Sequence, residues 1–479
     1  MADFDVVVIG AGSGNALVGD GFPGLRVALV DGGVPFGGTC LNKGCIPSKM
    51  LSHVAATAEA VRGAGALGLT VAAPKLDWPA IRDRVFGRID PIAAAGEASR
   101  ANSDNVTLFR GNARFVNPHM VRVDLLDGTT ANLTADTFVV AVGARPVVPN
   151  VRGLDDPKLA GLVFTSDDVM RVERLPKSLA VMGGGVVAVE FADLFAGLGV
   201  QVTVIQRSGV LLRRADRDVA AAVTAQFAGR MALRLNQELA EVESSGQGMT
   251  LYAKDANGIE YTYQTEALLL AVGRRANTDR LGVDAAGLAV HPNGQLVVDA
   301  NLRTSQPHIW ALGDVDSPEL LKHVANHEAR VVRHNLEDPR HPVVAGNRPI
   351  PAALFTTPQV AWVGATEQDL EAAAIPYVAA KQHFRDVAMG WAMEDSSDDH
   401  FVKLLAEPET GLLLGAHIVG PEAALLLQPL IQAMTFGQDA KTVARGQYWP
   451  HPGLQEVVEN ALLKLDVSDP KRSRLPWRR

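Results

Sequence analysis

The stretch DVVVIGAGSGN, residues 5–15, decides the fold class of this sequence. Its apolar run is typical of a buried strand, and the glycine-rich turn after it opens a helix that we expect to run to about Gly21. A second apolar run, LRVALVD, ends at Asp31. A strand, a glycine turn, a helix and a strand in this order indicate a βαβ unit of the kind that binds a dinucleotide.

The same pattern returns about 170 residues later, in SLAVMGGGVVAVEFADLFAGLGVQVTVIQR, residues 178–207. Two such units predict an α/β protein with two doubly wound domains. The segments FVVAVGARPVVP and LLLAVGRRANT repeat a Val-Gly pair at the end of each domain's sheet. Residues 146–153, with two prolines and a glycine, are interpreted as a linker. From about residue 346 the pattern changes to that of an α+β domain.

Length and composition limit the other possibilities. The chain has 479 residues, which is too long for one core and predicts about three or four domains. A net charge of −8 without a basic face argues against a nucleic acid partner. No apolar run reaches the ~18 residues that cross a bilayer, and the first residues lack the basic start and the cleavage site of a signal peptide. We therefore expect a cytoplasmic protein.

The first glycine loop is an incomplete match to the dinucleotide motif G-x-G-x-x-G. Gly10 and Gly12 fill its first two positions, but Asn15 stands at the third. The strand before the loop and the helix expected after it support a pyrophosphate site. Asp31 is placed to hydrogen-bond a ribose hydroxyl. The alternative is a glycine turn that binds no ligand.

The second loop has Gly183, Gly185 and the small residue Ala188 at the three motif positions. Its closing strand ends in Gln206-Arg207 instead of a carboxylate, and Arg213 and Arg214 follow. A carboxylate there would repel the 2′-phosphate of NADPH, whereas a guanidinium group binds it bidentately. The sequence therefore favours NADPH over NADH. The alternative is that these arginines are ordinary solvated surface residues.

The only two cysteines, Cys40 and Cys45, lie in GGTCLNKGCIPSK, residues 37–49. Residues five apart in a regular helix have Cα atoms about 8.7 Å apart, beyond the ~4.4–6.8 Å of a disulfide. A bond between them needs a distorted helix, and we expect Gly44 and Pro47 to help. Such a bond would be strained and easily reduced, which suits a redox-active pair in a reducing cytoplasm.

Metal binding is the alternative for closely spaced cysteines. A structural zinc site needs four ligands, and the sequence has no second cysteine pair. His323 and His327 in HVANH are one helical turn apart, but they lack a clear third ligand. We expect no metal site.

Two nucleotide loops, a redox pair after the first loop, and the strand IWALGDV ending in Gly-Asp together resemble the two-dinucleotide-binding disulfide reductases, the family of glutathione reductase and dihydrolipoamide dehydrogenase. The resemblance covers almost all of residues 4–465. It implies FAD and NADPH as cofactors, Cys45 as the thiolate nearer the flavin, and Cys40 as the thiol that attacks a disulfide substrate. Lys49, paired with Glu190, would lie beside the flavin ring and stabilise its reduced anionic form.

The resemblance also implies further contacts to each cofactor. Asp314 would bind the ribityl chain of FAD, and Gly143 and Gly273 would close strands near the cofactors. The remaining FAD contacts that we expect are Ser13, Gly14, Gly38, Thr39, Ala113 and Gly313, in addition to Gly10, Gly12, Asp31 and Lys49. Those expected for NADPH are Gly183, Gly185, Ala188, Glu190, Arg207, Arg213 and Gly273.

Near the C-terminus, YWPHPGLQEVVEN contains His451 and Glu456. An imidazole titrates near neutrality, so His451 suits the proton transfers between thiols, and Glu456 would fix its tautomer. In the relatives this pair reaches into the partner subunit's active site, so the resemblance implies a homodimer with a shared site.

The substrate is not indicated by spacing. The stretches RVFGRIDPIAAAGE and ARGQYWPHPGLQEVVENALL, and the GSGN of the first loop, resemble the mycothione-reducing subfamily. This implies a low-molecular-weight disulfide, mycothione, as substrate. Dihydrolipoamide dehydrogenase remains an alternative that Arg207 disfavours, and mercuric ion reductase would need a further cysteine pair. A flavoprotein redox sensor without turnover would be expected to lose a cysteine, Lys49 or His451.

The expected domain order follows from these assignments. It is an FAD-binding domain with the redox disulfide over 1–150, an NADPH-binding domain over 151–272, a central domain completing the FAD site over 273–345, a dimerisation domain over 346–466, and a disordered basic tail over 467–479.

Overall fold

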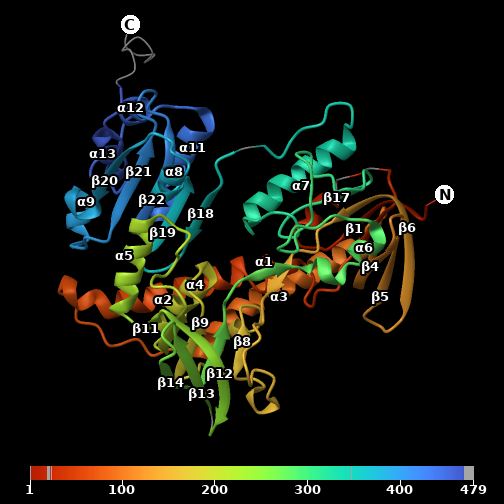
Figure 1. The fold of residues 1–479 in the computed structure, drawn as a ribbon, viewed down its shortest axis with the longest axis horizontal. Coiled ribbons are helices and arrows are strands. Elements are labelled where there is room, and N and C mark those ends of the chain that lie inside the picture. The colour runs from red at the N-terminus through yellow and green to blue at the C-terminus, as the bar shows by residue number, and fades with distance from the viewer. Residues whose placement is uncertain (1, 19–21, 23, 247, 347, 469–479) are drawn as a thin grey trace.

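The computed structural model describes residues 2–18, 22, 24–246, 248–346 and 348–468. The chain forms two regions built on parallel sheets and a C-terminal region built on an antiparallel sheet, which lies at the upper left of Figure 1. No helix in these described ranges has the length and apolar character needed to span a membrane. The expected tail lies almost wholly outside the described residues.

The first sheet has seven strands, in the order β3-β2-β1-β6-β5-β4, with β17 added beside β6. The parallel strands are β1 (Phe4–Ile9), β2 (Val27–Val30), β3 (Val106–Phe109), the C-terminal half of β6 (Thr130–Val140) and β17 (Ile309–Ala311). β4 (Gly111–Asn117) and β5 (Met120–Leu125) are antiparallel. Because β17 joins this sheet, residues 273–345 complete the first region and add no sheet of their own.

The second parallel sheet has the order β11-β10-β9-β15-β8. Its strands are β8 (Val163–Thr165), β9 (Ser178–Met182), β10 (Gln201–Gln206), β11 (Ala232–Leu235) and β15 (Ala267–Leu270). Helices α4 (Val186–Gly197) and α5 (Arg217–Ala228) belong to this region, and β12 (Gln237–Ser245), β13 (Gly248–Asp255) and β14 (Glu260–Thr265) form an antiparallel sheet beside it. The predicted pair of α/β units is confirmed.

The two repeated Val-Gly segments meet in space. β7 (Ala144–Pro146) and β16 (Arg274–Ala276) pair as a two-stranded antiparallel sheet. The expected linker around Gly153 is not a free connection, because a Cβ on Gly153 would lie 1.9 Å from the carbonyl oxygen of Val242 on β12. The connection is therefore packed against the second region.

The C-terminal region is α+β, as predicted. Its antiparallel sheet, in the order β18-β19-β22-β21-β20, consists of β18 (Pro351–Leu354), β19 (Gln359–Gly364), β20 (Val378–His383), β21 (Phe401–Ala406) and β22 (Leu413–Gly420). Its helices are α8 (Glu367–Ala372), α9 (Ala388–Ala392), α10 (Ala423–Leu426), α11 (Gln428–Phe436), α12 (Ala440–Arg445) and α13 (Glu456–Lys464). Their apolar faces form a separate core with the sheet.

The remaining helices cover the two parallel-sheet regions and bring them together. They are α1 (Gly38–Asn42), α2 (Cys45–Gly63), α3 (Trp78–Ala101), α6 (Val283–Ala286) and α7 (Lys322–Glu337). Asp77 caps α3 by accepting a hydrogen bond from the N–H of Ala80. α2 packs closely on α4, since a Cβ on Gly197 would lie 2.8 Å from that of Ala55. This packing joins the two nucleotide-binding regions.

The helix expected after the first glycine loop is wrong. Only one 3₁₀ turn, η1 (Gly14–Leu17), follows the loop, and the chain is extended at Val18. Residues 19–21 and 23 lie outside the described residues. The sequence GDGFPG beyond Val18 contains three glycines and a proline, which oppose helix propagation.

Candidate functional site

The two cysteines lie on separate helices instead of one distorted helix. Cys40 is in α1, and Cys45 is the first residue of α2. The chain breaks between them at Gly44, whose φ of −139° and ψ of −117° are not helical. Pro47 lies in the first turn of α2, where the missing N–H is tolerated, so it does not cause the break. The break is what allows the two thiols to approach one another.

Both cysteines are free thiols in this structure, with Cys45 exposed and Cys40 half-buried. The hydrogen bond from the Cys40 thiol lowers the pKa of Cys45 to about 7, and the positive charges of Lys49 and Lys322 act in the same direction. The same hydrogen bond, followed by burial, raises the pKa of Cys40. Cys45 is therefore the thiolate of the pair and Cys40 the thiol that donates to it.

Lys49 and Glu190 form an ion pair between α2 and α4. The same Glu190 oxygen accepts a hydrogen bond from the backbone N–H of Phe355, at 3.0 Å. The Lys49 ammonium lies 4.3 Å from the centre of the Phe355 ring, a cation–π distance. The structure thus brings together the two charges that the sequence placed in separate motifs, and it adds an aromatic neighbour.

The first glycine loop is shaped to admit a ligand close to its backbone. Gly10 has a φ of +108°, and a Cβ there would lie 2.3 Å from the carbonyl oxygen of Ala141. A Cβ on Gly38 would lie 2.5 Å from the Cα of Gly12, so the loop touches the start of the cysteine helix. The Asp31 carboxylate accepts from the N–H of Ala11 at 3.1 Å. This cradle of glycines with a carboxylate at the strand end fits an FAD diphosphate and ribose.

Two contacts at this loop were not predicted. The Lys322 ammonium, at the start of α7, donates to the hydroxyl of Ser13 at 3.0 Å. The Arg100 Nε, near the end of α3, donates to the side-chain oxygen of Asn15 at 2.7 Å. Gly14, instead of a glycine at position 15, packs closely on the sheet, since a Cβ on Gly14 would lie 2.9 Å from side chains of Val8 and Ala141.

The other residues expected at the cofactors lie on several elements, and one of them, Gly273, follows β15 of the second region. Gly313 follows β17 with a φ of +81°, and its N–H donates to the Glu328 carboxylate at 2.7 Å. Burial raises the pKa of Asp314, and the charges of Arg274 and Lys322 oppose this rise. Gly143 and Gly273 both have positive φ and open space at the Cβ position. Thr39 is in α1, and Ala113 is on β4, partly buried.

The second loop repeats the backbone geometry of the first. Gly183 has a φ of +124°, and a Cβ there would lie 2.4 Å from the carbonyl oxygen of Ala271. Gly185 caps α4, which runs for 12 residues, and Ala188 is fully buried beneath the loop. The free N–H groups at this helix start fit a nucleotide diphosphate. Arg207 and Arg213 are exposed near it, and they fit a 2′-phosphate.

His451 and Glu456 form a hydrogen-bonded pair in the C-terminal region. Nδ1 of His451 lies 2.8 Å from a Glu456 carboxylate oxygen, and the other carboxylate oxygen accepts from the N–H of Gly453 at 3.0 Å. The hydrogen bond to His451 lowers the pKa of Glu456. The imidazole side chain is 70% exposed. Within the described part of one chain, no hydrogen bond or ion pair links His451 to either cysteine.

His323 and His327 engage backbone carbonyl groups, those of Pro351 at 2.9 Å and Ala345 at 2.7 Å. Across the described residues, no group of three or more His, Cys, Asp or Glu side chains is arranged to hold a metal ion.

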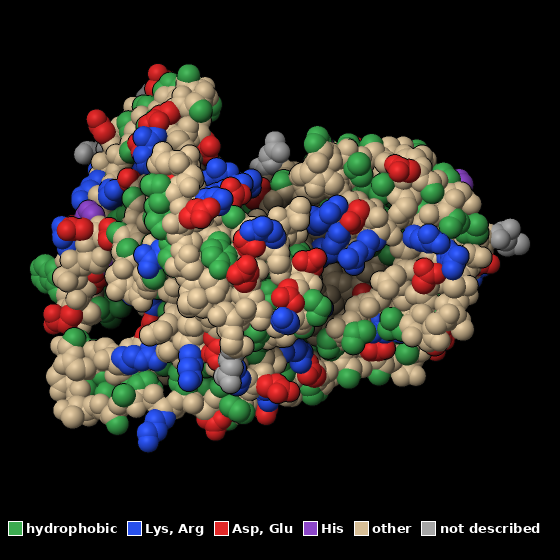
Figure 2. All heavy atoms as spheres, turned by 60° about the horizontal axis from the view of Figure 1, so that its bottom comes forward, with side chains coloured by type: hydrophobic (Ala, Val, Ile, Leu, Met, Phe, Trp, Pro, Cys, Tyr) green, Lys and Arg blue, Asp and Glu red, His purple; other side chains and the backbone are tan. Residues whose placement is uncertain are grey.

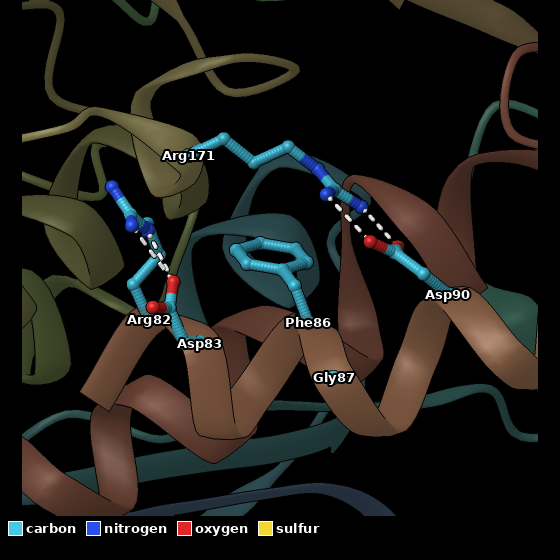
Figure 3. A pocket seen from close by; sticks show the side chains of 6 residues that line it. All are labelled: Arg82, Asp83, Phe86, Gly87, Asp90 and Arg171. Carbon is cyan, nitrogen blue, oxygen red and sulfur yellow. Dashed lines mark hydrogen bonds and ion pairs between the residues drawn. The ribbon is translucent and has the colours of Figure 1, made fainter. Parts of the chain in front are cut away.

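A shallow hollow of about 470 Å³ lies along α3 (Figure 3). Arg171 crosses it, with its guanidinium 3.7 Å from the centre of the Phe86 ring and bonded to both oxygens of Asp90. Arg82 bonds to Asp83 at 2.8 Å. These charges are paired with one another, and we assign the hollow no ligand. Figure 2 shows acidic and basic side chains interspersed over the face that it draws.

Comparisons with known proteins agree with this geometry. Residues 4–329 match the family described as "Pyridine nucleotide-disulphide oxidoreductase", and residues 350–462 match the dimerisation domain of the same family. The mycothione reductase of Mycobacterium tuberculosis is 44% identical, over 97% of this chain and 100% of that protein. The dihydrolipoyl dehydrogenase of Halobacterium salinarum is 34% identical, over 95% of each chain.

Among solved structures, the Cu(II) complex of the HOCl-induced flavoprotein disulfide reductase RclA from Escherichia coli is similar in fold. Its TM-score is 0.84 at 25% sequence identity, and the match covers 97% of this chain and 99% of that one. The similarity therefore extends over both nucleotide-binding regions and the C-terminal region.

Proposed function

Because the chain belongs to the pyridine nucleotide-disulphide oxidoreductase family and is an FAD-dependent disulfide reductase, we propose that it reduces mycothione to two molecules of mycothiol with electrons from NADPH. The observation that carries this proposal is the 44% identity with a mycothione reductase over nearly the whole of both chains. The dihydrolipoyl dehydrogenases of comparable coverage are 31–34% identical.

The choice of NADPH over NADH rests on the arginines after β10. The strand that closes the second loop ends without a carboxylate, and Gln206 instead donates to the hydroxyl of Ser208 at 2.9 Å. Arg207 and Arg213 remain exposed to solvent beside the loop. In our proposal they bind the 2′-phosphate, where a guanidinium group gains more than it does as a solvated surface charge.

In the reductive half-reaction, FAD supplies a carrier that accepts a hydride from NADPH and passes two electrons to a disulfide. We assign its binding to the first loop, Asp31, Lys49, Thr39, Ala113 and the Gly313-Asp314 turn. Glu190 holds the Lys49 ammonium in place, where it would stabilise a reduced flavin. The two electrons and the proton delivered with the hydride reduce the Cys40–Cys45 disulfide to a thiol and a thiolate.

In the oxidative half-reaction, His451 of the partner subunit takes the proton of Cys40, and the Cys40 sulfur attacks one sulfur of mycothione. A mixed disulfide forms, and the substrate S–S bond breaks. The departing thiolate receives the proton from the imidazolium, which Glu456 keeps in one orientation. The Cys45 thiolate then attacks the Cys40 sulfur and restores the Cys40–Cys45 disulfide. The second mycothiol leaves as a thiolate and takes up a proton from solvent.

The match to the family's dimerisation domain supports a homodimer. That the two subunits share each active site is part of our proposal. It is supported by His451, which is exposed and, among the described residues, makes no hydrogen bond or ion pair with the cysteines of its own chain. We also propose a cytoplasmic location and the functional division of the chain into FAD-binding, NADPH-binding, central and dimerisation segments.

The test is a steady-state comparison of disulfides with the purified flavoprotein. We expect kcat/KM for mycothione to exceed that for glutathione disulfide and lipoamide by at least about a hundredfold, and NADPH to be preferred over NADH. Equal turnover of lipoamide would assign the chain to dihydrolipoamide chemistry instead. A protein that is reduced by NADPH but turns over no disulfide would be a redox sensor.

A further inference from the structure

The two nucleotide loops differ in the helix that follows each of them. The second loop opens α4, a helix of 12 residues. The first loop opens only η1, a 3₁₀ turn of four residues, after which Val18 has a φ of −101° and a ψ of 149°. The dipole of an α-helix and its free N–H groups stabilise a bound diphosphate. The first loop lacks a helix long enough to supply this stabilisation.

A lysine reaches the first loop from the far end of the region. Lys322 is the first residue of α7, 309 positions after Ser13 in the sequence, and its ammonium donates to the Ser13 hydroxyl at 3.0 Å. The Lys322 charge also acts on Asp314 and on both cysteines. The ammonium is therefore held at the glycine loop and is near enough to the thiols and to Asp314 for its charge to act on them.

An arginine reaches the same loop from α3. Its Nε donates to the side-chain oxygen of Asn15, the residue that replaces the third glycine of the motif. Within the described residues the guanidinium group of Arg100 makes no other hydrogen bond, so its two terminal nitrogens are available to a ligand. A guanidinium group anchored through Nε presents the pair of donors that suits a phosphate.

We propose that Lys322 and Arg100 bind the diphosphate of FAD and replace the helix N-terminus that the first loop lacks. Asn15 and Ser13 position the two cations, which gives a reason for asparagine at the third motif position. The carboxylate of Asp31 does not neutralise the charges of these two cations, because it accepts a hydrogen bond from the N–H of Ala11 and is paired with Arg110 at 3.3 Å. Asp314 is the other carboxylate that faces Lys322.

The test measures FAD binding to the apoprotein, with the cysteines oxidised so that no thiolate charge contributes. Removing one charged hydrogen-bond donor to a phosphate weakens binding by about tenfold or more. We therefore expect Lys322→Met and Arg100→Met each to raise the Kd of FAD by about tenfold, and the double variant to raise the Kd further. The quenching of flavin fluorescence on binding measures the Kd. Salt should weaken FAD binding less steeply in the variants than in the unaltered protein.

Smaller probes locate the effect. ADP, AMP and adenosine are used as competitors of FAD, and only ADP carries the diphosphate. The variants should lose affinity for ADP and retain it for adenosine. Lys322→Arg keeps the charge and should retain most of the FAD affinity, whereas Arg100→Lys keeps the charge without the pair of donors and should retain only part of it. A partial recovery in these variants separates loss of charge from misfolding. Arg88→Met removes an exposed cation from the same helix as Arg100 and is the matched control.

Unchanged FAD affinity in both methionine variants would overturn the proposal, and so would an equal loss of affinity for adenosine and ADP. No disulfide substrate or NADPH enters the measurement. Its outcome is therefore independent of whether mycothione is the substrate.

Discussion

The Glu190 carboxylate on α4 binds the Lys49 ammonium of α2 and, through the same oxygen, the backbone N–H of Phe355 at 3.0 Å. One side chain therefore joins the cysteine-bearing helix, the second nucleotide-binding region and the start of the C-terminal region. One turn later on α4, Asp193 repeats the arrangement by accepting from the N–H of Thr357 at 3.1 Å. The position of Lys49 is thus fixed by contacts from outside its own region.

We predict that Glu190→Gln slows reduction of the bound flavin by NADPH by about tenfold or more. The amide keeps the size of the side chain but removes the charge that holds the ammonium, so Lys49 is no longer fixed toward the flavin. Stopped-flow absorbance of the anaerobic protein mixed with NADPH measures this step alone. Glu260→Gln breaks an exposed ion pair with Lys254 and should leave the rate unchanged. Equal rates for Glu190→Gln and the unaltered protein would show that the charge of Glu190 is not needed to hold Lys49 for flavin reduction.

The thiolate of Cys45 should titrate with a pKa of about 7 in the reduced protein. The Cys40 thiol is its hydrogen-bond donor, so we predict that Cys40→Ala raises the pKa of Cys45 by about one unit or more. Alkylation of Cys45 by iodoacetamide, located by mass spectrometry and followed from pH 5 to pH 10, reports the thiolate fraction. The midpoint should move upward in the variant. A midpoint that does not move would show that Lys49 and Lys322, and not Cys40, set the thiolate.

The sequence predicted correctly those features of the fold and the site that are encoded within one short segment. The glycines and apolar runs of residues 5–15 and 178–207 predicted both nucleotide-binding units, and GGTCLNKGCIPSK predicted the thiols and Lys49. The pairing of Lys49 with Glu190 followed from the family resemblance, because 141 residues separate the two. Local sequence patterns alone would not have predicted that Lys49 and Glu190 form a pair.

The sequence was insufficient for contacts between distant segments and for the course of the first βαβ unit. Lys322 and Arg100 are ordinary helix charges in the sequence, and only the fold brings them to Ser13 and Asn15. The helix expected to reach Gly21 ends at Leu17, because the glycines and the proline that follow oppose helix propagation more strongly than the dinucleotide motif favours it. Likewise, one helix was assumed for both cysteines although Gly44 permits a break.

Replacement of Glu456 by glutamine should separate the two half-reactions. Glu456 orients the His451 ring through a 2.8 Å hydrogen bond and supplies the negative charge opposite the imidazolium. We predict that kcat/KM for the disulfide substrate falls by about tenfold to a hundredfold, because the proton transfers between thiols lose their oriented acid and base. Flavin reduction by NADPH should keep its rate in stopped-flow experiments. Glu459→Gln on the same helix is the control. Loss of both half-reactions would point to a structural defect instead.

The last prediction concerns Lys403, which is buried on β21 among three carboxylates. Its ammonium lies 2.8 Å from Asp216, 2.6 Å from Glu367 and 3.0 Å from Asp218, and only 3% of its side chain is exposed. Asp216, which is fully buried, caps α5 in the second region, so the cluster ties that region to the C-terminal one. Burial alone would raise the pKa of Asp216, but the hydrogen bonds from Lys403 and from the N–H of Glu367, together with the charges of His417 and Lys403, outweigh it, and the pKa is lowered.

Lys403→Met removes the cation and leaves buried carboxylates without it, which costs about 3–5 kcal/mol when a buried pair is broken. We expect the melting temperature at pH 7 to fall by about 5 °C or more. Because the pKa of Asp216 is lowered in the folded protein, its carboxylate stabilises the fold at any pH above the ordinary carboxylate pKa. This stabilisation is lost as the pH falls through the pKa that Asp216 has in the folded protein. The difference between the variant and the unaltered protein should therefore stay nearly constant from pH 7 to about pH 4 and narrow below pH 4, as calorimetry at each pH would show. Lys254→Met, at an exposed pair, should change neither melting temperature nor its pH dependence. A deficit that does not narrow below about pH 4 would mean that Lys403 stabilises the fold by packing and not by its charge.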